Sequence, residues 1–153
     1  MKVMGIDPGS NCTGFAIVEE IKSDLHAVHW SSVRSTSKHT FPDRLKCIYD
    51  ELVLAIEKFQ PDVVVVEDLF YATNVKTVIK LAQTRGVILL AAINCGIELA
   101  EYSPLEIKQS VVGYGRADKN QVRDMVTVLL NFKKTRTEFD EPVLPDSPAK
   151  PAG

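Results

Sequence analysis

Hydrophobic and polar residues alternate along the first 34 residues in three runs, which short connections separate. The runs cover residues 3–7, 13–19 and 26–34, and each has the length and composition of a β-strand. Because the connections hold only a few residues, the three strands are predicted to form an antiparallel meander.

Two longer segments repeat apolar residues at helical spacing. Residues 41–59 predict a helix that Thr40 can cap and whose first turn suits Pro42. Residues 74–92 predict a second helix that contains Gly86. A glycine inside a helix costs about 1 kcal/mol relative to alanine, and close packing at Gly86 is the reason we expect for it.

The remaining pattern alternates between strands and helices. Four consecutive valines at 63–66 predict a strand buried on both faces, and residues 97–102 predict a further strand. Residues 104–112 predict a short helix, and Asp118 can cap a last one. The apolar face of that last helix consists of Val122, Met125, Val126, Leu129 and Leu130. The predicted fold class is therefore α/β, with a mixed five-stranded sheet flanked by helices.

Composition narrows the class of protein. With 153 residues, 45% of them hydrophobic and 25% charged, the chain has the size and balance of one globular domain. Its three cysteines form no CxxC motif, which favours a reducing, cytoplasmic location over a disulfide framework or a zinc site. No signal peptide is apparent, and the longest apolar stretch, residues 86–94, is too short to span a membrane.

Charge is unevenly distributed although the net charge is only −2. Residues 106–136 contain seven basic residues against three acidic ones. The basic residues are Lys108, Arg116, Lys119, Arg123, Lys133, Lys134 and Arg136. Such a stretch can form a nucleic-acid-binding surface, and it can equally be an ordinary solvated helix face.

Two acidic residues stand at strand ends. Asp7 ends the first predicted strand before Pro-Gly-Ser, and Glu67 follows the four valines. Acids at the ends of neighbouring strands would share one edge of the sheet, and carboxylates without nearby His or Cys prefer Mg²⁺ or Mn²⁺. Two such ions could serve phosphodiester cleavage. Both acids could instead be ordinary turn residues, as the adjacent Asp68 warns.

Longer motifs indicate a family. The segments GIDPGSNCTGFAIV, VVVEDLFYATNVKTVIKLAQTRGVILLAA, EYSPLEIKQSVVGYGRADKNQV and MVTVLL follow one another between about residue 1 and residue 132. In this order they resemble the RuvC family of bacterial Holliday-junction resolvases. The resemblance implies an RNase H-like fold and a homodimer that nicks opposed strands of four-way junction DNA. It also implies Mg²⁺ as cofactor (Mn²⁺ being an alternative), two ions per subunit, and a branch-migration helicase complex of the RuvA and RuvB type as partner.

The resemblance also assigns residues. Asp7 and Glu67 match the first two family acids, which are catalytic metal ligands. Phe70 matches an aromatic residue that stacks on an unpaired base of the junction. Lys108 and Lys119 match lysines near the scissile phosphate, and Arg116 lies in the glycine-rich turn between them.

One predicted helix carries a second expectation. Residues 74–92 match the helix through which dimers of this family pair. Three basic residues of that helix are expected to face DNA instead of a second subunit. They are Lys76, Lys80 and Arg85.

The C-terminus departs from the family pattern. Asp140 matches the first of two acids on the family's last helix, whereas Val143 stands where the second is expected. Loss of one nucleotide from an Asp-Ala codon pair would give Val143-Leu144, so residues after 142 are interpreted as out of frame. Asp146 is an alternative acid. The expected organisation is a nuclease domain at 1–140 followed by a proline-rich, disordered tail at 141–153.

Two functions follow as alternatives. The chain is either a metal-dependent, structure-selective endonuclease in DNA recombination and repair, acting through Asp7, Glu67 and Asp140, or a junction-binding protein with impaired catalysis. A nucleotide-binding kinase on the same fold is a more remote possibility, because a sugar kinase needs a second domain.

Overall fold

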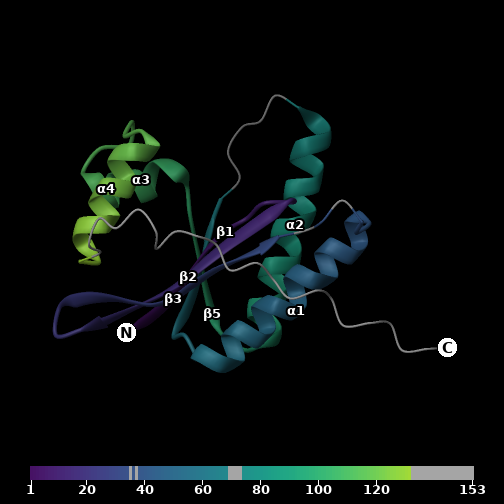
Figure 1. Cartoon of the computed structure of the whole chain (residues 1–153), viewed down its shortest axis with the longest axis horizontal. Helices are drawn as coiled ribbons and strands as arrows, with labels where there is room; N and C mark the ends of the chain where they lie inside the picture. Colours follow the sequence, from purple (N-terminus) through teal and green to yellow (C-terminus); the bar gives the residue numbers. More distant parts are fainter. Residues whose placement is uncertain (35, 37, 69–73, 132–153) are drawn as a thin grey trace.

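The computed structural model describes residues 1–34, 36, 38–68 and 74–131 of the chain (Figure 1). Five strands form one sheet in the order β3-β2-β1-β4-β5. They are β1 (Lys2–Asp7), β2 (Cys12–Ile21), β3 (Asp24–Arg34), β4 (Val63–Glu67) and β5 (Glu98–Tyr102). The first three pair as the predicted antiparallel meander, while β4 lies parallel to both β1 and β5. The prediction of a mixed five-stranded sheet is confirmed.

Within the described ranges, four helices begin where the sequence provides a capping side chain. They are α1 (Phe41–Phe59), α2 (Val75–Asn94), α3 (Pro104–Val112) and α4 (Lys119–Leu129). Thr40, Asn74, Ser103 and Asp118 cap them in that order, each accepting hydrogen bonds from backbone amides of the first turn. In α1 and α3 a proline occupies one of the first two helical positions, where its missing N–H needs no partner.

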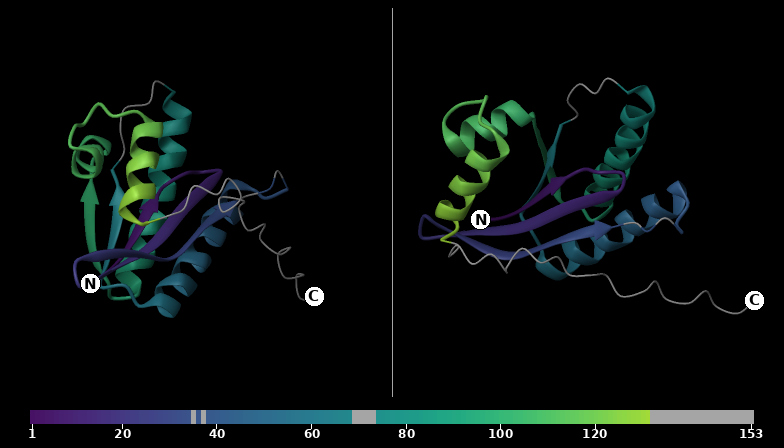
Figure 2. Two further views of the ribbon diagram at one scale, coloured as in Figure 1. Left: turned by 60° about the vertical axis from the view of Figure 1, so that its left-hand side comes forward. Right: turned by 45° about the horizontal axis from the view of Figure 1, so that its top comes forward.

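The core lies between one face of the sheet and helices α1 and α2, which pack against each other. Alternate residues of the central strands supply the sheet side of this core, and Ile48, Leu52, Ile56 and Ile88 supply much of the helix side. Figure 2 shows both helices on the same side of the strands. In β4 only Val64 and Val66 are fully buried, whereas Val63 and Val65 remain partly exposed. The prediction that this strand is buried on both faces is therefore wrong. Among the described residues, helices fully cover only one face of β4.

Gly86 does not have the role predicted for it. It is exposed on α2, and a Cβ added there would meet no atom within 4 Å among the described residues. Close packing against the described part of the chain is thus not the reason for a glycine at this position.

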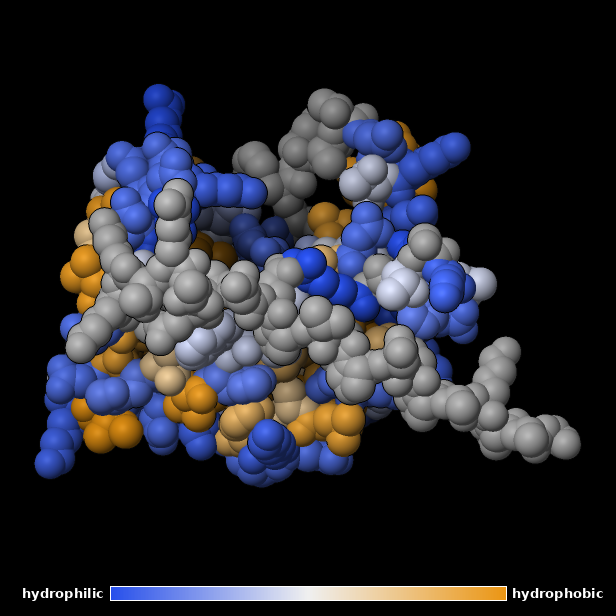
Figure 3. All heavy atoms as spheres, in the orientation of Figure 1, coloured by the Kyte–Doolittle hydropathy of each residue, from blue (hydrophilic) through white to orange (hydrophobic). Residues whose placement is uncertain are grey.

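Helices α3 and α4 form a separate pair next to the end of β5 (Figure 1). Neither helix has a fully buried residue, although α4 carries the predicted apolar face. Hydrophilic residues cover much of the pair in the space-filling view, with hydrophobic ones at its lower end (Figure 3). Val128 and Leu129, the last two residues of α4, are exposed.

The domain boundary and the apolar character of the helices concern the chain as a whole. Residues 132–153 lie outside the described part, so the boundary between a domain at 1–140 and a tail at 141–153 stays a prediction. Among the described helices, none combines the length and apolar character that a membrane crossing requires.

Candidate active site

Asp7 and Glu67 come together at one edge of the sheet. They end the adjacent parallel strands β1 and β4, which are in register up to the pair Ile6 and Val66. Because side chains alternate along a strand, the buried Ile6 and Val66 face the helices, and the acids that follow them face the opposite side. The two carboxylates therefore lie side by side on the face that α1 and α2 leave open.

The electrostatics of Glu67 define the site. Partial burial raises its pKa, and the charge of Asp7 and a hydrogen bond between the two carboxyl groups raise it further. Lys108 and Lys119 act in the opposite direction and lower the same pKa. Two acids from the sheet and two lysines from the α3–α4 pair are thus close enough to influence one another. The sequence predicted these four residues as part of one site, and the structure brings them together.

The segment after Asp7 is a tight turn. The Thr13 hydroxyl donates to the Gly9 carbonyl oxygen at 2.8 Å, and a Cβ on Gly9 would lie 2.1 Å from the Cys12 carbonyl oxygen. A glycine is required at such an approach. The interpretation of Asp-Pro-Gly as a turn is therefore correct, and Asp7 is the last residue of β1.

Short-range interactions shape the α3–α4 pair. Ser103 and Glu106 form a reciprocal capping box, and the hydrogen bonds from the Ser103 side chain and backbone lower the pKa of Glu106. Gly113 ends α3 with φ of +93°, and a Cβ on Gly115 would lie 2.6 Å from Leu105 Cγ. The glycine-rich turn thus folds tightly back onto α3.

The basic residues of this pair differ in exposure. Lys108 is half-buried on α3, whereas Arg116 in the turn and Lys119 at the start of α4 are exposed. Of the three, Lys108 and Lys119 are close enough to Glu67 to affect its pKa. Part of the basic stretch, namely Lys133, Lys134 and Arg136, lies outside the described residues.

Arg85 is turned into the protein and not toward solvent. Its side chain is only 14% exposed and pairs with Asp68 and Glu101. Lys80 lies over the ring of Phe41 at 5.7 Å. The expectation for Arg85 is wrong because two carboxylates draw its guanidinium inward.

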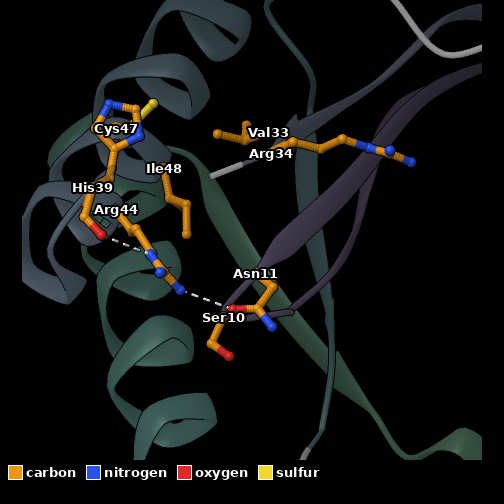
Figure 4. Close-up of a pocket in the computed structure, with 8 residues that line it drawn as sticks. All are labelled: Ser10, Asn11, Val33, Arg34, His39, Arg44, Cys47 and Ile48. Carbon is orange, nitrogen blue, oxygen red and sulfur yellow. Dashed lines mark hydrogen bonds between the residues drawn. The ribbon is translucent and has the colours of Figure 1, made fainter. Parts of the chain in front are cut away.

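A pocket that the sequence did not reveal lies beside the turn that follows Asp7 (Figure 4). Ser10, Asn11, Val33, Arg34, His39, Arg44, Cys47 and Ile48 line it. Arg44 donates from Nη1 to Asn11 Oδ1 at 2.9 Å and from Nε to the His39 carbonyl oxygen at 3.3 Å. Arg44 therefore ties α1 to the β1–β2 turn. The figure shows the Arg34 side chain extending away from this group.

Three predicted residues cannot be placed. Phe70, Asp140 and the alternative acid Asp146 lie outside the described residues. Within the described ranges no group of three or more His, Cys, Asp and Glu side chains is arranged to hold a metal ion. The part of the site that the structure describes is thus the pair Asp7 and Glu67.

These two carboxylates fit a divalent cation. Both are hard oxygen ligands, and Glu67 occupies a partly desolvated position in which the neighbouring charge of Asp7 disfavours its ionised form. A cation between the two carboxylates would remove the repulsion between their charges. This is a chemical reason for two acids to lie side by side at the ends of adjacent strands.

The sequence of the whole chain identifies its relatives. The family model described as "Crossover junction endodeoxyribonuclease RuvC" matches residues 3–142. The chain belongs to the RuvC family. RuvC of Finegoldia magna is 45% identical over 134 residues, which cover 88% of this chain and 82% of that protein. RuvC of Koribacter versatilis is 46% identical over 141 residues, 92% of this chain and 85% of the relative.

Solved structures of RuvC share this architecture. Thermus thermophilus RuvC matches with a TM-score of 0.81 at 28% identity, covering 88% of this chain and 82% of that one. The same protein in complex with a Holliday junction substrate matches with a TM-score of 0.82, at the same identity and coverage. The yeast mitochondrial Holliday junction resolvase Ydc2 matches over 84% of this chain and 64% of its own, with a TM-score of 0.59 and 15% identity, and shows the fold alone. The predicted RNase H-like fold is confirmed.

Proposed function

We propose that this chain is a metal-dependent endonuclease that nicks opposed strands of four-way DNA junctions in recombination and repair. The observation that carries the proposal is the pairing of Asp7 with Glu67 at one sheet edge, within the electrostatic reach of Lys108 and Lys119. Membership of the RuvC family supports it, and a RuvC of this fold has been solved with a Holliday junction substrate. The alternative, a junction-binding protein without catalysis, is not favoured.

Each part of the site has a role in this reaction. Asp7 and Glu67 would hold the metal, Mg²⁺ or Mn²⁺, and we expect two ions per subunit with Asp140 as a further ligand. When bound, such ions activate a water molecule and stabilise the leaving oxygen of a phosphodiester. Lys108 and Lys119 bind the phosphate and partly offset the charge of the acids.

DNA contacts extend outward from the acids. Arg116 is exposed in the turn between the two lysines, so its guanidinium can bind a neighbouring phosphate in two hydrogen bonds. Phe70 follows the strand that ends at Glu67, and its assignment to stacking on an unpaired base rests on the resemblance.

A homodimer through α2 is part of the proposal. Val75, Ile79, Leu90 and Ile93 are exposed on this helix. Together with the exposed Gly86 they recur at helical spacing and form one apolar stripe. A glycine in the stripe would allow the helix of a second subunit to approach closely. Association with a complex of the RuvA and RuvB type follows from the family resemblance alone.

The direct test uses a synthetic four-way junction and the intact chain. We expect symmetrically placed nicks on two opposed strands when Mg²⁺ is present, and none with EDTA or on linear duplexes of the same sequence. Electrophoretic mobility shifts in EDTA report binding separately. Junction binding without nicking at any Mg²⁺ or Mn²⁺ concentration would support the binding-protein alternative.

The C-terminus provides a second test of the same choice. The family match ends at residue 142, directly before Val143. Restoring an Asp-Ala-Leu helix from position 143 should accelerate single-turnover nicking if the second C-terminal acid is missing. Equal rates for both chains would show that Asp140 or Asp146 already completes the metal site.

A further inference from the structure

Arg85 lies across β4 from Glu67 and connects the residue that follows Glu67 to β5. Its Nη2 lies 3.2 Å from Asp68 Oδ1 and also contacts the Glu101 carboxylate. Both Nε and Nη2 are excluded from solvent. A guanidinium placed this deeply requires anionic partners, and both of these partners belong to the end of the sheet that carries the acids.

The alternation of side chains relates this cluster to Glu67. Glu101 pairs with Val66 across the sheet, on the face that α2 covers. Asp68 reaches Arg85 on that same face, so Glu67, which lies between Val66 and Asp68, is turned to the opposite face. Val66 and Asp68 thus flank Glu67 with side chains on the face opposite to it.

Backbone pairing with β5 also holds this strand end. Glu67 is the last residue of β4 and pairs with Tyr102. Beyond it, the Asp68 N–H donates to the Tyr102 carbonyl oxygen at 2.8 Å. Removal of the guanidinium would leave the carboxylates of Asp68 and Glu101 without the cation that they share, and the attachment of β4 to β5 at this end would weaken.

We propose that Arg85 is a positioning residue for the candidate active site, which holds the carboxyl end of β4 through Asp68 and Glu101 so that Glu67 faces Asp7. The effect on cleavage rests on the proposed nuclease function, whereas the effect on the strand end does not. Arg85 acts through the acids and does not contact DNA, since its inner nitrogen atoms are closed to solvent.

Amide hydrogen exchange tests the strand end without requiring catalysis. In Arg85→Gln the Asp68 amide should exchange at least about tenfold faster, while amides in the interior of β4 stay within about twofold of wild type. Lys46→Gln, which breaks an exposed ion pair with Asp50 on α1, is the matched control and should change neither. An unchanged Asp68 amide, or uniform acceleration throughout the sheet, would overturn the proposal.

The Mg²⁺ dependence of single-turnover nicking tests the consequence for the site. Arg85→Gln should raise the half-saturating Mg²⁺ concentration about tenfold and leave the junction Kd within about twofold of wild type. Arg85→Lys should recover part of this loss because it keeps the charge, and adding Glu101→Gln to Arg85→Gln should recover part because it removes one unpaired carboxylate.

The remaining outcomes are distinct. Unaltered Mg²⁺ dependence would contradict the positioning role. A weaker junction Kd with a salt slope flatter by about one unit would make Arg85 a phosphate contact instead. If the wild-type chain does not nick junctions at all, the proposed function fails, and the exchange experiment alone decides the role of Arg85.

Discussion

The acids and the cations of the candidate site are supported in different ways. Asp7 and Glu67 follow Ile6 and Val66, which belong to the buried core between the sheet and helices α1 and α2. The lysines lie on α3 and α4, which have no fully buried residue and, within the described part of the chain, pack chiefly against each other. Local capping by Ser103 and Asp118, more than burial, defines these two helices.

This difference corresponds to the chemistry of each group. Metal ligands must keep their geometry to within about 0.5 Å, which requires a rigid support. A lysine that attracts phosphate acts over longer distances and tolerates small movements, because the Coulomb energy falls only slowly with separation. We therefore expect substitutions of the acids to affect chemistry, and substitutions of the cations to affect binding.

The largest effect should come from Asp7→Asn. Removal of one ligand charge should lower the nicking rate by at least about 10³-fold, equivalent to about 4 kcal/mol, while junction affinity stays the same or increases because a negative charge near phosphate is lost. Single-turnover nicking and mobility shifts measured on the same preparation separate the two effects. Full activity of the variant would remove Asp7 from the metal site.

A matched pair of leucine substitutions compares the two supports directly. Leu52 on α1 is fully buried, so Leu52→Ala should lower the free energy of unfolding by about 2–5 kcal/mol. Leu129 on α4 is 42% exposed, and Leu129→Ala should cost about 0.5 kcal/mol. Urea denaturation measures both values. A large loss in Leu129→Ala would mean that residues outside the described part cover α4.

The sequence was most informative where a local rule determines the structure. Thr40 with Pro42 located the start of α1, and the strand-end positions of Asp7 and Glu67 predicted that the two acids would meet. These features depend on residues that are close in sequence or on the alternation of side chains within a strand.

Interactions between distant residues were not predictable in this way. The ion pairs of Arg85 depend on how α2 lies over β4 and β5. A helical pattern alone does not distinguish an arginine exposed on the surface from one held in an ion pair. The exposure of Gly86 and the contact of Arg44 with Asn11 likewise depend on packing between elements. The assignment of Asp140 as a further metal ligand remains a prediction from the resemblance.

Smaller effects are expected from the cations. Alanine at Lys108, Arg116 or Lys119 should weaken junction binding by about 1 kcal/mol and flatten the slope of log affinity against log salt by about one unit. Lys46→Ala on α1, which covers the opposite face of the sheet from the acids, should leave the slope unchanged. Identical slopes in all four variants and wild type would place the DNA elsewhere.

Lys108 should differ from Arg116 in one further respect. Lys108 lowers the pKa of Glu67, so its removal raises that pKa, and nicking by Lys108→Ala should fall more at low pH than at high pH. Binding by Arg116→Ala should weaken with no such pH dependence. If the nicking rates of the two variants depended on pH in the same way, a direct electrostatic link between Lys108 and Glu67 would be contradicted.

The smallest effect concerns the stability of the metal-free protein. The pKa of Glu67 is raised in the folded state above its unfolded value of about 4.5. The folded state therefore loses stability relative to the unfolded state as the pH rises through the window between the unfolded and the folded pKa. Below it the carboxyl group is protonated in both states and carries no penalty. Glu67→Gln removes the group, and it should raise the Tm by about 2 °C at neutral pH in EDTA and leave it unchanged near pH 4.

Saturating Mg²⁺ should make wild type more stable than Glu67→Gln, because wild type alone keeps both ligands and gains stability from the ion. Thermal unfolding of the two proteins at both pH values, with and without Mg²⁺, measures the differences. A variant less stable than wild type in EDTA at neutral pH would show that Glu67 stabilises the fold through its own contacts, and the two carboxylates would then not be a site that awaits a cation.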